Sequence, residues 1–262
     1  MKKDILQTII AHKYKEVTAQ QEAISLTQLE ALLGIPTQGI SMQQSLTQSS
    51  HGIIAEFKRR SPSKNWINEK AIPEHVIPAY QQADASALSI LTDELFFGGS
   101  LQDLHVSRPL THLPILRKDF IISPYQLYQA KLMGADAVLL IAACLTATQC
   151  KQLAQHAHNL KMEVLLEIHE ESELEYLNEY VNMIGVNNRH LGTFHTDVSV
   201  SFKLAERLPK EFTLISESGI SNPETVKQLR EIGFQGFLMG ENFMKTPYPG
   251  KALSNFIQLL KP

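Results

Sequence analysis

From Gly52 to the carboxyl terminus, short apolar segments alternate with amphipathic helical segments. Eight of the apolar segments have the length and composition of buried strands, at residues 53–57, 87–91, 114–117, 137–141, 163–168, 183–186, 213–216 and 236–239. No two of them are joined by a tight hairpin signal such as Asn-Gly, so each strand is expected to return through the helical segment that follows it. This alternation predicts parallel strands covered by helices.

Several helix boundaries carry recognisable end signals. Thr146 with Gln149, and Ser221 with Glu224, fit the capping box, in which two side chains satisfy the first free backbone N–H groups of a helix. Gly233 is placed to end the second of these helices. The spacing of such signals supports a regular series of strand-then-helix units.

A closed barrel is the preferred arrangement of these units. The chain has 262 residues, close to the roughly 250 typical of a (β/α)8 TIM barrel. An open doubly wound sheet is the alternative, but its dinucleotide-binding loop, Gly-x-Gly-x-x-Gly after the first strand, is absent. We therefore predict a single α/β barrel domain that spans residues 1–262.

Residues 1–50 differ from the repeating units. Residues 4–23 have helical spacing with one apolar side, a second helical segment covers 26–33, and Gly34 and Pro36 end it. A stretch rich in Gln, Ser and Thr then leads into the first strand. These residues predict an N-terminal helical extension that packs on the barrel.

Composition narrows the class of protein. A net charge of -3, with 44% hydrophobic and 19% charged residues, is typical of a soluble globular protein and argues against nucleic-acid or membrane-surface binding. Neither a membrane span nor a signal peptide is evident, so a cytoplasmic location is expected. Cys144 and Cys150 are expected to be reduced thiols, and His156 and His158 lie on different sides of a helix, which excludes a shared metal. We expect a monomer or a weak homo-oligomer.

Polar residues gather where the predicted strands end. In a parallel barrel these ends form one mouth, where active sites are built. Any one of these side chains alone is best explained as a solvated loop charge, but six strands contribute at equivalent depth, which favours an active site. Among the loop charges, Asp93, Glu94 and Asp119 are assigned mainly to structure or to orienting neighbours. The candidates are Glu56, Lys58, Lys118, Glu167, Asn187, Arg189, Glu217 and Ser218.

Glycines after the last two strands indicate a phosphate site. Ser218-Gly219 and Gly240-Glu241 leave backbone N–H groups uncovered, and many barrels bind phosphate at this place. Glycine also serves simply to allow positive φ, and the two explanations are equally good for either glycine alone. Arg189 is suited to close such a site with a two-pronged contact to phosphate oxygens.

Six segments in order resemble the successive motifs of the indole-3-glycerol phosphate synthase family. They are Ile-Ala-Glu-Phe-Lys-Arg-Arg-Ser-Pro-Ser (54–63), Leu-Thr-Asp-Glu-x-Phe-Phe-x-Gly-Ser (91–100), Leu-Arg-Lys-Asp-Phe (116–120), Leu-Leu-Glu-Ile-His (165–169), Ile-Gly-Val-Asn-Asn-Arg (184–189) and Ser-Glu-Ser-Gly-Ile (216–220). The resemblance runs from about residue 4 to the carboxyl terminus. It implies a lyase of tryptophan biosynthesis that converts 1-(2-carboxyphenylamino)-1-deoxyribulose 5-phosphate to indole-3-glycerol phosphate, carbon dioxide and water.

The resemblance also implies roles for individual residues. Lys118 matches the general acid and Glu167 the proposed general base, and no metal or organic cofactor is expected. The surrounding catalytic positions match Glu56, Lys58, Asn187, Glu217 and Ser218. Binding of the phosphorylated substrate is expected of Lys58, Ser61, Arg189, Ser218, Gly219, Gly240 and Glu241. Lys58 is interpreted as holding either the carboxylate or the phosphate of the substrate, with Glu56 as its counter-charge and a candidate proton carrier.

Apolar residues near the mouth have two interpretations, a pocket for the anthranilate ring or ordinary packing. They are Phe97, Phe120, Leu139 and Leu191. Two positions depart from the family pattern, with Asn65 where Gly is frequent and His190 where Asp is frequent. We expect these changes to affect loop dynamics and rate and to leave the reaction itself unchanged.

Two alternative functions would require different residues at these positions. Phosphoribosylanthranilate isomerase would be expected to use a Cys and an Asp at the ends of the first and sixth strands, where this chain has Glu56, Lys58 and Asn187. A non-catalytic barrel that binds a phosphorylated metabolite would have lost its catalytic polar groups. This chain keeps both those groups and the predicted phosphate site.

Overall fold

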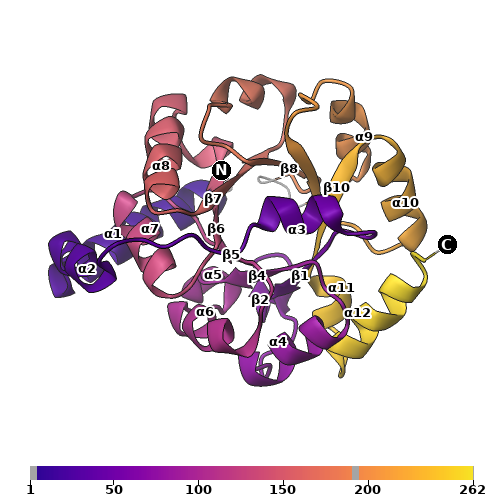
Figure 1. The fold of residues 1–262 in the computed structure, drawn as a ribbon, viewed down its shortest axis with the longest axis horizontal. Coiled ribbons are helices and arrows are strands. Elements are labelled where there is room, and N and C mark those ends of the chain that lie inside the picture. The colour runs from indigo at the N-terminus through magenta and orange to yellow at the C-terminus, as the bar shows by residue number, and fades with distance from the viewer. Residues whose placement is uncertain (1–4, 191–194, 262) are drawn as a thin grey trace.

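A closed barrel of eight parallel strands forms the centre of the molecule (Figure 1). The computed structural model describes residues 5–190 and 195–261. In barrel order the strands are β1 (Ile53–Phe57), β10 (Phe234–Met239), β9 (Thr213–Glu217), β8 (Met183–Asn187), β7 (Glu163–Ile168), β6 (Ala137–Ile141), β5 (Ile115–Lys118) and β4 (Ala87–Leu91). The predicted (β/α)8 fold is confirmed.

Helices surround the barrel and follow its strands in sequence. The main ones are α4 (Pro73–Gln82), α6 (Leu101–Ser107), α7 (Pro124–Leu132), α8 (Ala147–Asn159), α9 (Ser199–Ala205), α10 (Pro223–Glu231) and α12 (Pro249–Gln258). Shorter helical turns lie in the connections between these elements: α5 (Glu94–Phe97), η1 (Arg108–Leu110), η2 (Ala142–Cys144), η3 (Glu171–Tyr176), which alone joins β7 to β8, and α11 (Glu241–Met244).

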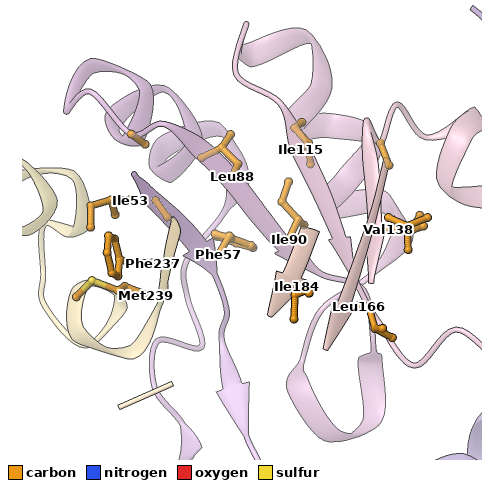
Figure 2. Close-up of a cluster of buried hydrophobic side chains, with 14 of the residues drawn as sticks. Ile53, Phe57, Leu88, Ile90, Ile115, Val138, Leu166, Ile184, Phe237 and Met239 are labelled. Carbon is orange, nitrogen blue, oxygen red and sulfur yellow. The ribbon is translucent and has the colours of Figure 1, made fainter. Parts of the chain in front are cut away.

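Alternate residues of each strand face opposite sides of the barrel wall. One set points outward and packs beneath the helices; Figure 2 shows members of it, including Phe57, Ile90 and Leu166. The other set fills the barrel interior with apolar side chains, among them Ile54, Leu116, Leu165 and Ile215. Two residues further along these four strands, on the same inner face, stand Glu56, Lys118, Glu167 and Glu217. The inner face therefore changes from apolar to charged toward the carboxyl end.

The N-terminal extension contacts both ends of the barrel. It contains α1 (Ile5–Ala23), α2 (Leu26–Leu33) and α3 (Met42–Gln48). Helix α3 was not predicted; it lies across the amino-terminal end (Figure 1), where Met42 and Leu46 are fully buried in the interior cluster. Ser41 and the N–H of Gln43 bind the two carboxylate oxygens of Glu163 at the start of β7, at 2.5 and 2.9 Å. These contacts explain why a polar segment folds as a helix here.

A small hairpin interrupts the first strand-to-helix connection. Strands β2 (Arg60–Ser61) and β3 (Asn65–Trp66), which were not predicted, pair antiparallel. The eight predicted strands themselves pair in parallel, as expected. Asn65 has a φ of 59°, a left-handed conformation that Asn tolerates better than most residues other than Gly. Asn65 thus keeps this turn conformation accessible.

Helix ends agree with the predictions in one case and not in the other. Thr146 and Gln149 form the predicted capping box at the start of α8. At α10 the prediction is wrong by one residue, because Asn222 is the N-cap and its side chain accepts from the N–H of Glu224 at 3.0 Å. Asn and Ser are both favoured at this position, so local sequence did not separate the two residues.

Within residues 5–190 and 195–261, no helix is long and apolar enough to cross a membrane. The same part of the chain contains no cluster of three or more His, Cys, Asp or Glu side chains arranged to hold a metal ion.

Candidate active site

A cavity of about 440 Å³ opens at the carboxyl ends of the strands. Every predicted site residue lines it, although the residues come from six different barrel strands and the loops that follow them. Proximity places these side chains in one site, whereas their individual roles remain predictions. The predicted residues in the wall are Glu56, Lys58, Ser61, Lys118, Glu167, Asn187, Arg189, Glu217, Ser218, Gly219, Gly240 and Glu241.

Lys118 lies between two carboxylates at the centre of the site. Its Nζ is 3.0 Å from Oε2 of Glu167 and 3.2 Å from Oε2 of Glu217. Both glutamates are almost fully buried, whereas the lysine side chain keeps 15% of its surface exposed to the cavity. The cationic group is thus the part of this cluster that a ligand can reach.

Lys118, Glu167 and Glu217 shift one another's pKa values. Burial by itself would lower the pKa of Lys118, but Glu167 and Glu217 outweigh burial and raise that pKa well above its ordinary range. Burial would raise the pKa of Glu167, but the charges of Lys118 and His169 hold it below its ordinary value. Burial raises the pKa of Glu217 to about 7, aided by the charge on Glu167 and opposed by Lys118. Lys118 is therefore a cation and Glu167 an anion at neutral pH.

Asn187 orients Glu167 from the neighbouring strand. Its Nδ2 donates to Oε1 of Glu167 at 2.9 Å, while its Oδ1 accepts from the backbone N–H of Arg189 at 3.0 Å. The second oxygen of Glu167 faces Lys118. With both oxygens engaged, the carboxylate is held in one orientation.

His169 stands behind Glu167. Its Nε2 is 3.5 Å from Oε1 of Glu167, and its Nδ1 is 3.6 Å from Oε2 of Glu173. Burial lowers the pKa of His169, but the nearby carboxylates of Glu173 and Glu167 outweigh burial and raise it. The protonated form of this histidine is therefore favoured beside the candidate base.

Glu56 and Lys58 form an ion pair on another part of the wall. Their separation of two residues places both on the inner face, as the strand pattern predicted. A Cβ atom at position 240 would overlap the Glu56 carboxylate, so Gly240 is required for this close approach. The Glu56–Lys58 pair therefore borders the loop after β10, where the phosphate site is predicted.

The predicted phosphate site is formed by the loops after β8, β9 and β10. Ser218 and Gly219 both have positive φ, 68° and 76°, which turns the backbone sharply at the end of β9. Arg189 reaches across from the loop after β8, and its Nη1 donates to Oγ of Ser63 at 2.8 Å. The short helix α11 begins directly after Gly240.

Sequence reasoning missed part of the cavity wall. Ile5, Leu6 and Ile9 of α1 line the cavity, as does Lys245 after α11. The spacing of the isoleucines showed an apolar helix face, but nothing local indicated that this face lies over the barrel mouth. Of the candidate apolar residues, Phe97, Phe120 and Leu139 line the cavity, and Leu191 falls outside the described residues.

The comparison with protein families decides the assignment. Residues 6–256 match the family described as indole-3-glycerol phosphate synthase. The chain belongs to the indole-3-glycerol phosphate synthase family. It is accordingly a decarboxylating lyase of tryptophan biosynthesis, and the family, enzyme class and function expected from the motifs are confirmed.

Curated relatives extend this similarity over nearly the whole chain. The chain is 59% identical over 259 residues to the indole-3-glycerol phosphate synthase of Bacteroides thetaiotaomicron, which covers 99% of this chain and 100% of that one. The enzyme of the same name from Delftia acidovorans is 40% identical and covers 96% of this chain and 98% of its own length.

Solved structures show the same fold at much lower identity. The chain superposes on 3-hexulose-6-phosphate synthase from Salmonella typhimurium with a TM-score of 0.62, at 12% identity over 80% of this chain and 98% of that one. A mutant tryptophan synthase alpha-subunit from Pyrococcus furiosus gives a TM-score of 0.60 at 14% identity, over 80% of this chain and 97% of that one. These structures support the barrel only, because their sequences are too distant to transfer a function.

Proposed function

We propose that the cavity carries out ring closure of 1-(2-carboxyphenylamino)-1-deoxyribulose 5-phosphate with Lys118 as general acid and Glu167 as general base. The observation that carries this proposal is the contact of Lys118 with Glu167 and Glu217 in the cavity wall. A cation held between two buried carboxylates stays protonated until a developing negative charge draws its proton away.

Ring closure begins at the carbonyl group of the ribulose part. The ring carbon that bears the carboxylate attacks the carbonyl carbon, and a C–C bond forms while the C=O π electrons move to oxygen. Lys118 polarises this oxygen and gives it a proton, which produces a hydroxyl group. The C–carboxylate bond then breaks, carbon dioxide leaves, and its bonding electrons restore the aromatic ring.

The second stage removes the new hydroxyl group as water. It needs a proton at the leaving oxygen, which Lys118 supplies after solvent has reprotonated it, and the loss of a proton from the neighbouring carbon. The C–O and C–H bonds break, and the indole double bond forms. Glu167 accepts that carbon-bound proton. Because Glu167 lies 3.0 Å from Lys118, the proton it gains can return to the lysine and reset the pair for another turnover.

The two ends of the substrate fit different parts of the cavity. Its phosphate is assigned to Arg189, the turn at Ser218-Gly219 and the loop at Gly240-Glu241, with Lys58 beside them. Its aromatic ring is assigned to the apolar part of the wall, where Phe120, Leu139 and Ile141 belong to one buried cluster. This division accounts for the cationic side chains inside a protein of net charge -3.

The direct test is formation of an indole. Purified protein incubated with the carboxyphenylamino-ribulose phosphate should show rising indole fluorescence, together with release of one equivalent of carbon dioxide. Phosphoribosylanthranilate, the substrate of the alternative isomerase, should remain unchanged in a parallel reaction. Folded protein at high concentration that yields no indole would contradict the proposed function.

We further propose that the chain acts as one domain, with residues 1–50 as its extension, and as a monomer or weak homo-oligomer in the cytoplasm. The contacts of the extension with both barrel ends support a single cooperative unit, and the net charge of -3 supports the absence of nucleic-acid partners. Light scattering on the purified protein and a single coincident unfolding transition test the assembly state and the domain assignment.

A further inference from the structure

A fully buried lysine connects the extension to the barrel mouth. Lys13 of α1 has no exposed surface, and its Nζ lies 2.9 Å from Glu16, 3.0 Å from Asp93 and 3.0 Å from Asp119. Glu16 belongs to the same helix, but Asp93 follows β4 and Asp119 follows β5. This cation therefore joins one helix to two strand ends.

The barrel side of this cluster is built to receive a cation. The second oxygen of Asp119 accepts from Thr92 at 2.6 Å and from Arg117 at 3.0 Å. Burial would raise the pKa of Asp119, but Lys13 and Arg117 outweigh burial and lower it to about 2. Asp93 and Asp119 are both almost completely buried. Carboxylates buried in this way are strongly unfavourable without a partner. The two aspartates therefore need the ammonium group of Lys13, and the buried ammonium group needs the aspartates.

The cluster around Lys13 adjoins the active site both through the barrel and through helix α1. Asp119 directly follows Lys118 and is itself part of the cavity wall. On the helix side, Ile9 is four residues before Lys13, on the same face of α1, and packs in the same cluster as Phe120 and Leu139. One turn further, Ile5 and Leu6 also line the cavity.

We propose that Lys13 is a positioning residue of the active site. By binding Asp93 and Asp119, it holds the first turns of α1 across the barrel mouth. Those turns then supply the apolar wall that faces the aromatic part of the substrate. The inference rests on the proposed function, and it adds a residue outside the predicted site to the machinery of that reaction.

The test compares two methionine variants of the same helix. Lys13→Met keeps the length of the side chain and removes its charge, whereas Lys15→Met makes the same change at an exposed position of α1. In folded protein, Lys13→Met should raise the KM for the carboxyphenylamino-ribulose phosphate roughly tenfold, with a smaller change in kcat, because displacement of a substrate-contacting wall weakens binding. Lys15→Met should match the unmodified chain. Lys13→Arg, which keeps the charge, should recover part of the lost affinity.

A stability readout separates positioning from a purely structural role. Circular dichroism and thermal unfolding identify the temperature range in which Lys13→Met is folded, and kinetics are measured there. A folded Lys13→Met protein with unchanged KM and kcat overturns the positioning role, even if its Tm is lower. An unmodified chain that forms no indole overturns the proposed function instead.

If Lys13→Met does not fold, a second variant tests whether the first turns of α1 contribute to substrate binding. The double change Ile5→Ala with Leu6→Ala shortens the same wall and leaves the lysine and its carboxylates in place. A raised KM in this variant supports the positioning role of α1, and an unchanged KM overturns it.

Discussion

Lys118 Nζ lies 3.0 Å from Oε2 of Glu167, although the two residues are 49 positions apart in the chain. The contact is possible because the ends of β5 and β7 meet at the barrel mouth and both side chains point inward. It places an acid and a base within proton-transfer distance before any substrate arrives. The proposed reaction needs both groups, and the structure lets each set the charge of the other.

Replacing Lys118 by Met should abolish most turnover. The variant loses the proton donor and the cation that stabilises the developing oxyanion, so kcat should fall by about 10²–10⁴. Steady-state assays that follow indole fluorescence measure this loss of kcat. Product affinity, measured by equilibrium titration, should change much less. The exposed Lys227 changed to Met provides the control and should keep full activity. A Lys118→Met protein with an unchanged turnover number would remove the lysine from its assigned role.

Glu167→Gln should slow the later steps more than ring closure. The amide keeps the shape and the contact with Asn187 but accepts no proton, so kcat should fall by roughly 10². Single-turnover experiments should show carbon dioxide release ahead of indole formation. Glu167→Asp keeps the charge with a shorter reach and should lose less. Simultaneous slowing of both signals would assign Glu167 to an earlier step.

Glu217→Gln should change how stability depends on pH. The pKa of Glu217 is about 7 in the folded chain, against an ordinary value of 4.5. Between these values the folded protein keeps a proton that the unfolded chain has released, so the free energy of unfolding falls as pH rises through this window. Gln does not ionise and escapes that loss. Relative to the unmodified chain, the variant should gain about 1–3 kcal/mol between pH 5 and pH 8.

Urea unfolding at pH 5 and at pH 8 measures this change in the free energy of unfolding. Glu241→Gln removes a carboxyl group from the same cavity wall at a more exposed place and serves as the comparison. A stability difference between Glu217→Gln and the unmodified chain that is equal at pH 5 and pH 8 would contradict the raised pKa.

Arg189→Ala should weaken substrate binding with little effect on the chemical step. Its guanidinium is assigned to the phosphate, which does not change during the reaction, so its binding energy is shared by substrate and transition state. KM should rise about tenfold while kcat stays within a few-fold. The KM of Arg189→Lys should lie between those of the unmodified chain and Arg189→Ala, because an ammonium group lacks the two-pronged geometry of a guanidinium group. The exposed Arg207, changed to Ala, is the matched control. Inorganic phosphate should inhibit the unmodified chain more strongly than Arg189→Ala.

Local sequence was a good guide wherever a residue's environment follows from its neighbours in the chain. The strand predictions agree with the structure within two residues, and the largest difference is at β10, which begins at Phe234. Strands β8 and β9 continue one residue further than predicted and include Asn187 and Glu217. The backbone of both residues is therefore held in the sheet, where Asn187 pairs with Glu217, and local composition at a strand end does not reveal this.

The N-terminal extension shows where such reasoning stops. Its first two helices follow from apolar spacing and end signals, whereas α3 does not, because Met42 and Leu46 are isolated in a polar stretch. They become core residues only when the open end of the barrel is beside them. Lys13 likewise carries no local sign of burial, because a lysine on a helix is ordinarily solvated. Its burial is explained only by two aspartates 80 and 106 positions away in the chain.

By itself the sequence determined the barrel, the family and the set of polar residues at the mouth. Period-two and helical patterns are local, and parallel strands bring all their carboxyl ends to one place whatever the details of packing. The tertiary structure decided which charges pair: Lys118 with Glu167 and Glu217, and Lys13 with Asp93 and Asp119. The physical reason is that an ion pair depends on distances of a few ångströms between residues far apart in the chain, and only the closed fold sets those distances.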